Sequence, residues 1–198
     1  MIMIRVNHNS FPHGPDNAEH ELKKAYNCVI EAGVTHFWSR RPIPGVNPYE
    51  VVTLYKNAME AYRENDRLTA ERWARCAKHL ARATWHEAKI SYLEPRPTEL
   101  PFLGEASEEF HLHEQPNSTA DLLNALSNQI PAGMTETPEE IRRYLLLGKR
   151  HLTELDNITS HQNELLKAER IKAAHEYGRT VECLLLVYEA TASKKKVA

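Results

Sequence analysis

The chain has few glycines, few cysteines and no long hydrophobic run. None of its seven glycines falls in a spacing that cradles a phosphate, which excludes P-loop enzymes and dinucleotide dehydrogenases. Three cysteines, Cys28, Cys76 and Cys183, are odd in number and far apart, which argues against a disulfide framework and a thiolate metal site. No stretch approaches the roughly 18 apolar residues of a membrane span, and the N-terminus lacks the pattern of a signal peptide. We therefore expect a cytoplasmic protein with no membrane contact.

Positive charge is absent from one long segment. From Pro97 to Ile141 there is no Lys or Arg, while nine acidic residues accumulate: Glu99, Glu105, Glu108, Glu109, Glu114, Asp121, Glu136, Glu139 and Glu140. The formal net charge of -2 is therefore an average over regions of opposite charge. With a pI near 6.6, the whole chain gives no reason to expect nucleic-acid binding, so any such binding would need a local basic patch.

A basic patch of this kind follows one face of a predicted helix between Glu71 and Ile90. Its members recur at spacings of three and four residues, and we call them the Arg/His face: Arg72, Arg75, His79, Arg82, His86 and Lys89. Alanine, leucine and tryptophan occupy the opposite face, so we expect the apolar side to enter a core and the Arg/His face to stay outside it. Two hypotheses follow. In the first, the acidic segment pairs with this face within a subunit or across a dimer. In the second, the face is an anion site for phosphate or nucleic acid. We favour the first.

Capping residues and hydrophobic periodicity predict an all-α bundle of five or six helices. Asp16, with an acid three residues later, begins a helix that we expect Gly33 to end. Asn47 begins a second helix, and Asn65 with the following Asp predicts a tight turn into the helix that carries the Arg/His face. Residues 48–93 should therefore form an antiparallel hairpin with its core side made by Tyr55, Met59, Tyr62, Trp73, Ala77, Leu80 and Thr84. Later helices are predicted to begin near Ser118, Thr137 and Thr159.

The remaining segments are predicted to be extended or irregular. Ile2–Val6 alternates and Val34–Trp38 is rich in aromatics, so both are predicted strands. We expect a single helical domain over 1–198, with 1–47 as an appendage that includes a short extended N-terminal segment. Residues 94–117 form a long acidic connection.

One histidine pair is the best candidate for a metal site. His111 and His113 stand at alternate positions with Glu109 and Glu114 beside them, a pattern that could supply imidazole and carboxylate ligands. Because the chain has eleven histidines, one close pair is unsurprising. We therefore expect no bound metal and no cofactor, and keep a metal-dependent enzyme as a third hypothesis.

Two further His and Glu pairs lie on the predicted closing helices. His151 with Glu154 and His161 with Glu164 are each three residues apart. Carboxylate-bridged di-metal bundles use the opposite order, Glu-x-x-His, together with further core glutamates. We therefore interpret both pairs as hydrogen bonds at the surface.

The stretch from Ala58 to Ala83, with its regular alanine spacing, resembles the central hairpin of HEPN-type helical bundles. It is also similar to a single tetratricopeptide-like hairpin. The HEPN resemblance implies a ribonuclease that cuts RNA without metal through an Arg and a His a short interval apart. Candidate pairs are Arg72 with His79 and Arg170 with His175. The residues after the two arginines are apolar, Trp73 and Ile171, where the family motif often has a polar residue.

These observations favour a binding or interaction protein rather than an enzyme. We expect a homo-oligomer or a complex with an acidic protein partner, formed through the Arg/His face. The alternative is a HEPN-like ribonuclease or nucleic-acid binder that uses the same residues.

Overall fold

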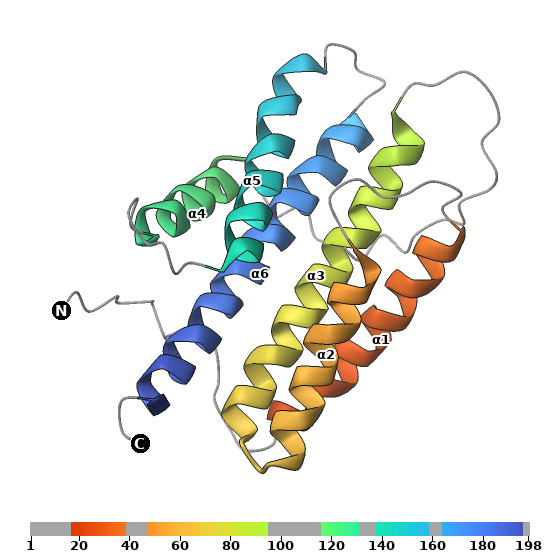
Figure 1. The fold of residues 1–198 in the computed structure, drawn as a ribbon. Coiled ribbons are helices and arrows are strands. Elements are labelled where there is room, and N and C mark those ends of the chain that lie inside the picture. The colour runs from red at the N-terminus through yellow and green to blue at the C-terminus, as the bar shows by residue number, and fades with distance from the viewer. Residues whose placement is uncertain (1–16, 39–46, 95–115, 131–137, 159–163, 196–198) are drawn as a thin grey trace.

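The computed structural model describes residues 17–38, 47–94, 116–130, 138–158 and 164–195, which form helices and contain no strand (Figure 1). The helices are α1 (Asn17–Trp38), α2 (Pro48–Arg63), α3 (Arg67–Leu93), α4 (Pro116–Gln129), α5 (Glu139–Thr153), the 3-10 helix η2 (Glu154–Asn157) and α6 (Glu164–Lys195). The predicted all-α class is confirmed.

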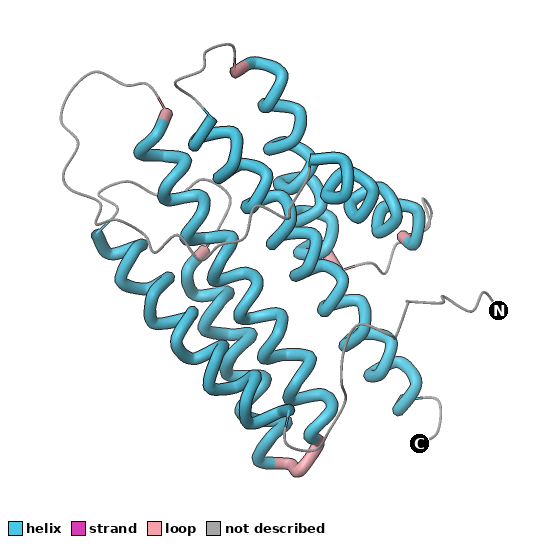
Figure 2. Tube along the Cα trace, turned by 180° about the vertical axis from the view of Figure 1, so that it is seen from behind, coloured by secondary structure: helices cyan, strands magenta, loops and turns pink. Residues whose placement is uncertain are grey.

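The helices are arranged around α3. α1, α2 and α3 run up and down beside one another, and α6 packs along the other side of α3 in the antiparallel direction (Figures 1 and 2). α5 packs on α6, and α4 lies against both of them. Because α3 contacts three long helices, most of its circumference is buried. The arrangement therefore places the predicted Arg/His face inside the bundle.

Alanine residues let α1, α2 and α3 approach one another closely. Those buried between the three helices are Ala18, Ala25, Ala58, Ala61, Ala70, Ala74 and Ala77. A methyl side chain fills the space between close helices without a large loss of rotamer freedom. The alanine spacing behind the resemblance drawn above thus serves helix packing in this bundle.

The predicted hairpin of residues 48–93 is confirmed. The Asn47 side chain accepts a hydrogen bond from the Tyr49 amide, and Asp66 accepts one from the amide of Thr69. Between the helices Asn65 has a φ of 62°, a left-handed conformation that asparagine tolerates better than most residues. Of the predicted core residues, Ala77, Leu80 and Thr84 are fully buried, and the four larger ones pack partly buried against the core.

Two expectations for the N-terminal region are wrong. Val34–Trp38 is the last part of α1 rather than a strand, and Gly33 lies within the helix instead of ending it. Helical packing against α3 overrides the local strand preference and the roughly 1 kcal/mol cost of an interior glycine. Residues 17–38 are consequently part of the bundle, not of an appendage. The predicted strand Ile2–Val6 and most of the connection 94–117 lie outside the described residues.

Candidate functional site

The Arg/His face of α3 lies against α6 and α1 instead of facing solvent. α3 and α6 are antiparallel, so residues seven apart on one helix meet residues seven apart on the other: His79 and His86 meet Glu176 and Glu169. The expectation that this face stays outside the core is wrong, because α3 is covered on several sides at once.

One polar unit joins the middle of α3 to α6. His79 Nδ1 lies 2.5 Å from Glu176 Oε2, and Arg82 Nη1 lies 3.6 Å from the other carboxylate oxygen, Oε1. His79 and Glu176 are buried, whereas Arg82 reaches the surface. Each oxygen of the carboxylate therefore has a partner on α3.

The same unit is repeated seven residues further along α3. His86 Nδ1 lies 2.6 Å from Glu169 Oε2, and Lys89 Nζ lies 3.6 Å from Glu169 Oε1. Lys172, on α6 itself, donates to the same Oε1 over 3.3 Å. We call the two arrangements the His–Glu–cation units. Together they fix the register of α3 against α6, since a shift by one residue would leave two buried carboxylates without their partners.

The two carboxyl groups are strongly acidic. Burial alone would raise the pKa of Glu176, but the charge and hydrogen bond of His79 and the charge of Arg82 outweigh it and lower the pKa to about 2. Burial is likewise outweighed at Glu169 by His86, Lys89 and Lys172, which bring its pKa to about 2. Burial lowers the pKa of His79 despite the opposing pull of Glu176. At neutral pH we therefore assign an ionised Glu176 that accepts from the Nδ1–H of a neutral His79, with Arg82 supplying the countercharge.

The other two members of the face are also engaged within the chain. Arg72 Nη1 donates to the Leu186 carbonyl of α6 over 3.0 Å, and Arg75 pairs with Glu71 at 2.7 Å. Among the described residues, the acidic partners of this face lie on α3 and α6, and pairing with the acidic segment of residues 97–141 stays a prediction. Most of that segment lies outside the described residues.

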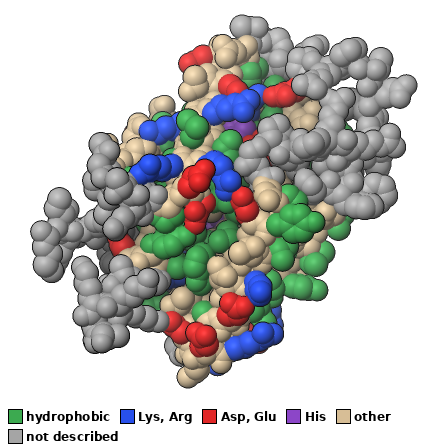
Figure 3. Space-filling view, in the orientation of Figure 1, with side chains coloured by type: hydrophobic (Ala, Val, Ile, Leu, Met, Phe, Trp, Pro, Cys, Tyr) green, Lys and Arg blue, Asp and Glu red, His purple; other side chains and the backbone are tan. Residues whose placement is uncertain are grey.

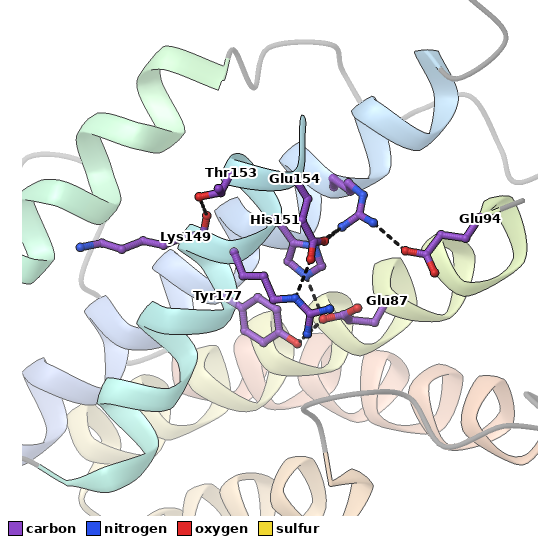
Figure 4. A network of polar contacts seen from close by, with 9 residues as sticks. Glu87, Glu94, Lys149, His151, Thr153, Glu154 and Tyr177 are labelled. Carbon is purple, nitrogen blue, oxygen red and sulfur yellow. Dashed lines mark hydrogen bonds and ion pairs between the residues drawn. The ribbon is translucent and has the colours of Figure 1, made fainter. Parts of the chain in front are cut away.

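A second buried network, which sequence reasoning missed, lies where α3, α5 and α6 meet (Figure 4). Glu87 Oε1 accepts a hydrogen bond from the Tyr177 hydroxyl at 2.9 Å and lies 2.8 Å from His151 Nε2. The rings of His151 and Tyr177 are stacked, with centroids 6.0 Å apart. The prediction that His151 makes a surface pair with Glu154 is therefore wrong: His151 is buried and its partner is 64 residues away.

Arg170 closes this network toward the surface. Its guanidinium donates to Glu94 at 2.6 Å and to Glu154, which also pairs with Arg150 at 2.7 Å. The arginine thus ties α6 to the C-terminal ends of α3 and α5. Of the other predicted surface pair, His161 lies outside the described residues, and Glu164 pairs with Lys167.

Three of the four residues in the arginine and histidine pairs implied by the HEPN resemblance have partners elsewhere in the bundle. Arg72 binds a backbone carbonyl of α6 while His79 binds Glu176, and Arg170 is held between Glu94 and Glu154. These contacts orient the helices, and the HEPN resemblance stays a prediction.

Within the part of the chain that the structure describes, no three His, Cys, Asp or Glu side chains come together as metal ligands. The metal candidates Glu109, His111, His113 and Glu114 fall in the undescribed segment 95–115. None of the described helices is both long enough and apolar enough to span a bilayer.

The outer side of α1 and α2 carries large apolar side chains that the bundle leaves exposed. Tyr26, Ile30 and Val34 follow one another at four-residue spacing on α1 and are 52%, 50% and 51% exposed. Val52 of α2 is also about half exposed, and Tyr49 more so. We call these five residues the α1–α2 face, and hydrophobic side chains are visible where α1 and α2 lie in Figure 3.

A groove of about 590 Å³ adjoins this face between the two helices. Apolar side chains of both helices line it, among them Leu22, Tyr26, Tyr55 and Met59, and so do the polar Glu19, Lys23 and Asn27 of α1. The rings of Tyr26 and Tyr55 lie 6.1 Å apart. The groove and the exposed row on α1 lie next to each other, because Tyr26 belongs to both.

No family model matches the chain, and no curated protein or solved structure is significantly similar to it. Its function must therefore be argued from its own contacts and surfaces.

Proposed function

We propose that this chain is a cytoplasmic interaction protein that forms a homodimer through the α1–α2 face. The supporting observation is the row of Tyr26, Ile30 and Val34, three large apolar side chains that are each half exposed on consecutive turns of one helix. Single exposed apolar residues are ordinary, but a contiguous row on one face is typical of a binding surface. Val52 and Tyr49 of α2 extend the row.

We infer that the partner is a second copy of the chain, because the face offers both protruding apolar side chains and a groove that could receive them. In a two-fold interface the same patch meets itself, so the ridge of Ile30 and Val34 in one copy can enter the groove beside Tyr26 and Tyr55 in the other. Burying aromatic and branched apolar side chains in such a groove supplies most of the affinity of an interface.

The charges around the face also favour a second copy over a strongly charged partner. Glu19 pairs with Lys23 at 2.8 Å on α1, and Lys56 pairs with Glu60 at 3.8 Å on α2. These two pairs place charges of both signs beside the face. Such a rim can match its own copy but selects neither a basic nor an acidic surface.

The Arg/His face is not part of this proposal. Its two histidines are buried against the carboxylates of α6, so a partner protein could reach them only by displacing those carboxylates. The ribonuclease alternative remains a prediction that no described contact favours. It requires RNA cleavage that His79→Ala abolishes.

The test is the mass of the protein in solution, measured by size-exclusion chromatography with light scattering. We expect the wild type to have about twice the mass of the 22.8 kDa chain. Ile30→Glu should shift it to the monomer, because two carboxylates would be buried in the two-fold interface. Since Ile30 is half exposed in the subunit, the substitution should leave the helical circular dichroism unchanged.

Leu146→Glu is the matched control. Leu146 is also a large exposed apolar residue, but it lies on α5 and not on α1 or α2. The control should remain dimeric. A wild type that stays monomeric at millimolar concentration, or a dimer that Leu146→Glu dissociates and Ile30→Glu does not, would contradict the proposal.

A further inference from the structure

A cleft of about 280 Å³ lies between α1 and α3. Lys24, Asn27 and Glu31 line it from α1, and Arg82 and Trp85 line it from α3. This volume lies just below the range of about 300–1,000 Å³ that is usual for ligand pockets. It suits a molecule of amino-acid size rather than a nucleotide.

The positive side of the cleft is preorganised by a contact described above. Arg82 Nη1 lies 3.6 Å from Glu176 Oε1, and its guanidinium also contacts the Cys28 thiol. These contacts hold the arginine in place, while 36% of its side chain remains exposed. A guanidinium has five N–H donors and can bind a carboxylate while it keeps such contacts.

The α1 side of the cleft carries charges of both signs. The Lys24 side chain is 50% exposed, and Glu31 is also exposed, three residues from Cys28. A multiply charged anion such as phosphate would meet the carboxylate of Glu31 as well as the two cations. A ligand with one negative and one positive group would match both signs.

Trp85 gives the cleft an apolar wall. Lys89 Nζ lies 3.6 Å from the centroid of the indole ring, and the His86 ring meets the same ring edge to face, with centroids 5.0 Å apart. The indole is therefore oriented by neighbours that belong to the second His–Glu–cation unit. A flat apolar group can pack against such a wall.

We propose that the cleft binds a small zwitterion of the amino-acid class, with its carboxylate on Arg82 and Lys24, its ammonium group on Glu31 and its side chain against Trp85. Asn27 offers a further donor and acceptor between the charged groups. The proposal concerns a ligand site on the subunit and does not depend on the dimer proposed above.

The test uses the full chain, with binding followed by amide NMR shifts and by calorimetry. The probes are L-phenylalanine, 3-phenylpropionate, which lacks the ammonium group, phenethylamine, which lacks the carboxylate, and inorganic phosphate. We expect saturable binding of L-phenylalanine with shifts centred on residues 24–31 and 81–85, and at least tenfold weaker binding of the other three probes.

Two variants separate the roles of the charges. Glu31→Gln should weaken L-phenylalanine at least tenfold and leave 3-phenylpropionate unchanged or slightly tighter. Arg82→Gln should abolish binding of both. Because Arg82 also contacts Glu176, Arg82→Gln can lose stability. The test is therefore decided by Glu31→Gln, which changes an exposed residue. Glu60→Gln, on α2 and outside the cleft, is the control and should bind like the wild type.

Three results would overturn the proposal: no saturable shift with any probe at millimolar concentration, phosphate binding at least as tightly as L-phenylalanine, or equal L-phenylalanine affinity in Glu31→Gln and Glu60→Gln. None of them bears on the mass of the protein, so failure of this proposal and failure of the dimer proposal are distinguishable.

Discussion

Replacing Glu176 by glutamine tests the first His–Glu–cation unit. Glutamine imitates the neutral form of the carboxyl group, so it removes the negative charge and keeps an oxygen that can accept from His79 Nδ1. The pKa of Glu176 is about 2 in the folded protein against 4.5 for the free side chain. At about 1.4 kcal/mol for each pH unit, the full shift corresponds to about 3 kcal/mol. Part of the shift comes from the charge of His79, which is neutral at pH 7, so the ionised carboxylate stabilises the fold by about 1–3 kcal/mol at that pH. Glu176→Gln should lose about that amount.

The pH dependence distinguishes loss of charge from loss of packing. A carboxyl group whose pKa is lowered by folding stabilises the protein above pH 4.5, and this contribution disappears as the pH falls toward 2. The difference in the free energy of unfolding between wild type and Glu176→Gln should therefore be present at pH 7 and close between about pH 4.5 and 2. Urea unfolding followed by circular dichroism at several pH values measures it.

Glu164→Gln provides the comparison for an exposed pair. Glu164 lies on the same helix and pairs with Lys167 at 3.1 Å, but its side chain is 66% exposed, so its loss should cost less than about 1 kcal/mol. If Glu176→Gln costs no more than this control, or if its cost is the same at pH 3 as at pH 7, the electrostatic argument for the unit is refuted.

Two further predictions concern packing and the second network. Gly148→Ala should lower the free energy of unfolding by about 1–3 kcal/mol, because the new Cβ would lie 3.0 Å from a Leu123 methyl and 3.3 Å from the Ala174 carbonyl. Gly33→Ala, whose Cβ meets nothing within 4 Å, should raise it by up to about 1 kcal/mol. Urea unfolding measures both variants, and effects of the opposite sign would refute this reasoning. Tyr177→Phe removes the hydroxyl that donates to Glu87 and should cost about 1–3 kcal/mol; an unchanged urea midpoint and slope would show that this buried hydrogen bond contributes nothing.

The sequence predicted which residues share a face, but not what covers that face. The spacing of His79, His86 and their basic neighbours correctly places them on one side of α3. An amphipathic pattern is normally read as one face in the core and one in water, and that assumption failed because α6 brings Glu169 and Glu176 to the polar face. These partners are 83 and 97 residues away. The matching seven-residue spacing of the two histidines and the two glutamates was the one local signal of the pairing.

Helix starts were easier to predict than helix ends and distant contacts. The cap at Asn47 and the turn at Asn65 depend on neighbouring residues only, and local chemistry was sufficient to predict them. The fate of Gly33 depends on packing of α1 against α3, and the partner of His151 is a glutamate on α3. Neither could be inferred without knowing which helices are neighbours. The exposure of Ile30 and Val34 likewise required the arrangement of the bundle.

The most direct test of the proposed function is an isotope-filtered NOE experiment on a mixture of labelled and unlabelled protein. It detects contacts between copies and assigns them to individual methyl groups. The account predicts intermolecular NOEs from the Ile30 and Val34 methyls to the rings of Tyr26 and Tyr55. Two results would contradict it. One is intermolecular NOEs that arise only from Leu146 or Leu165, the exposed leucines of α5 and α6. The other is a complete lack of intermolecular NOEs when the methyl signals are well resolved.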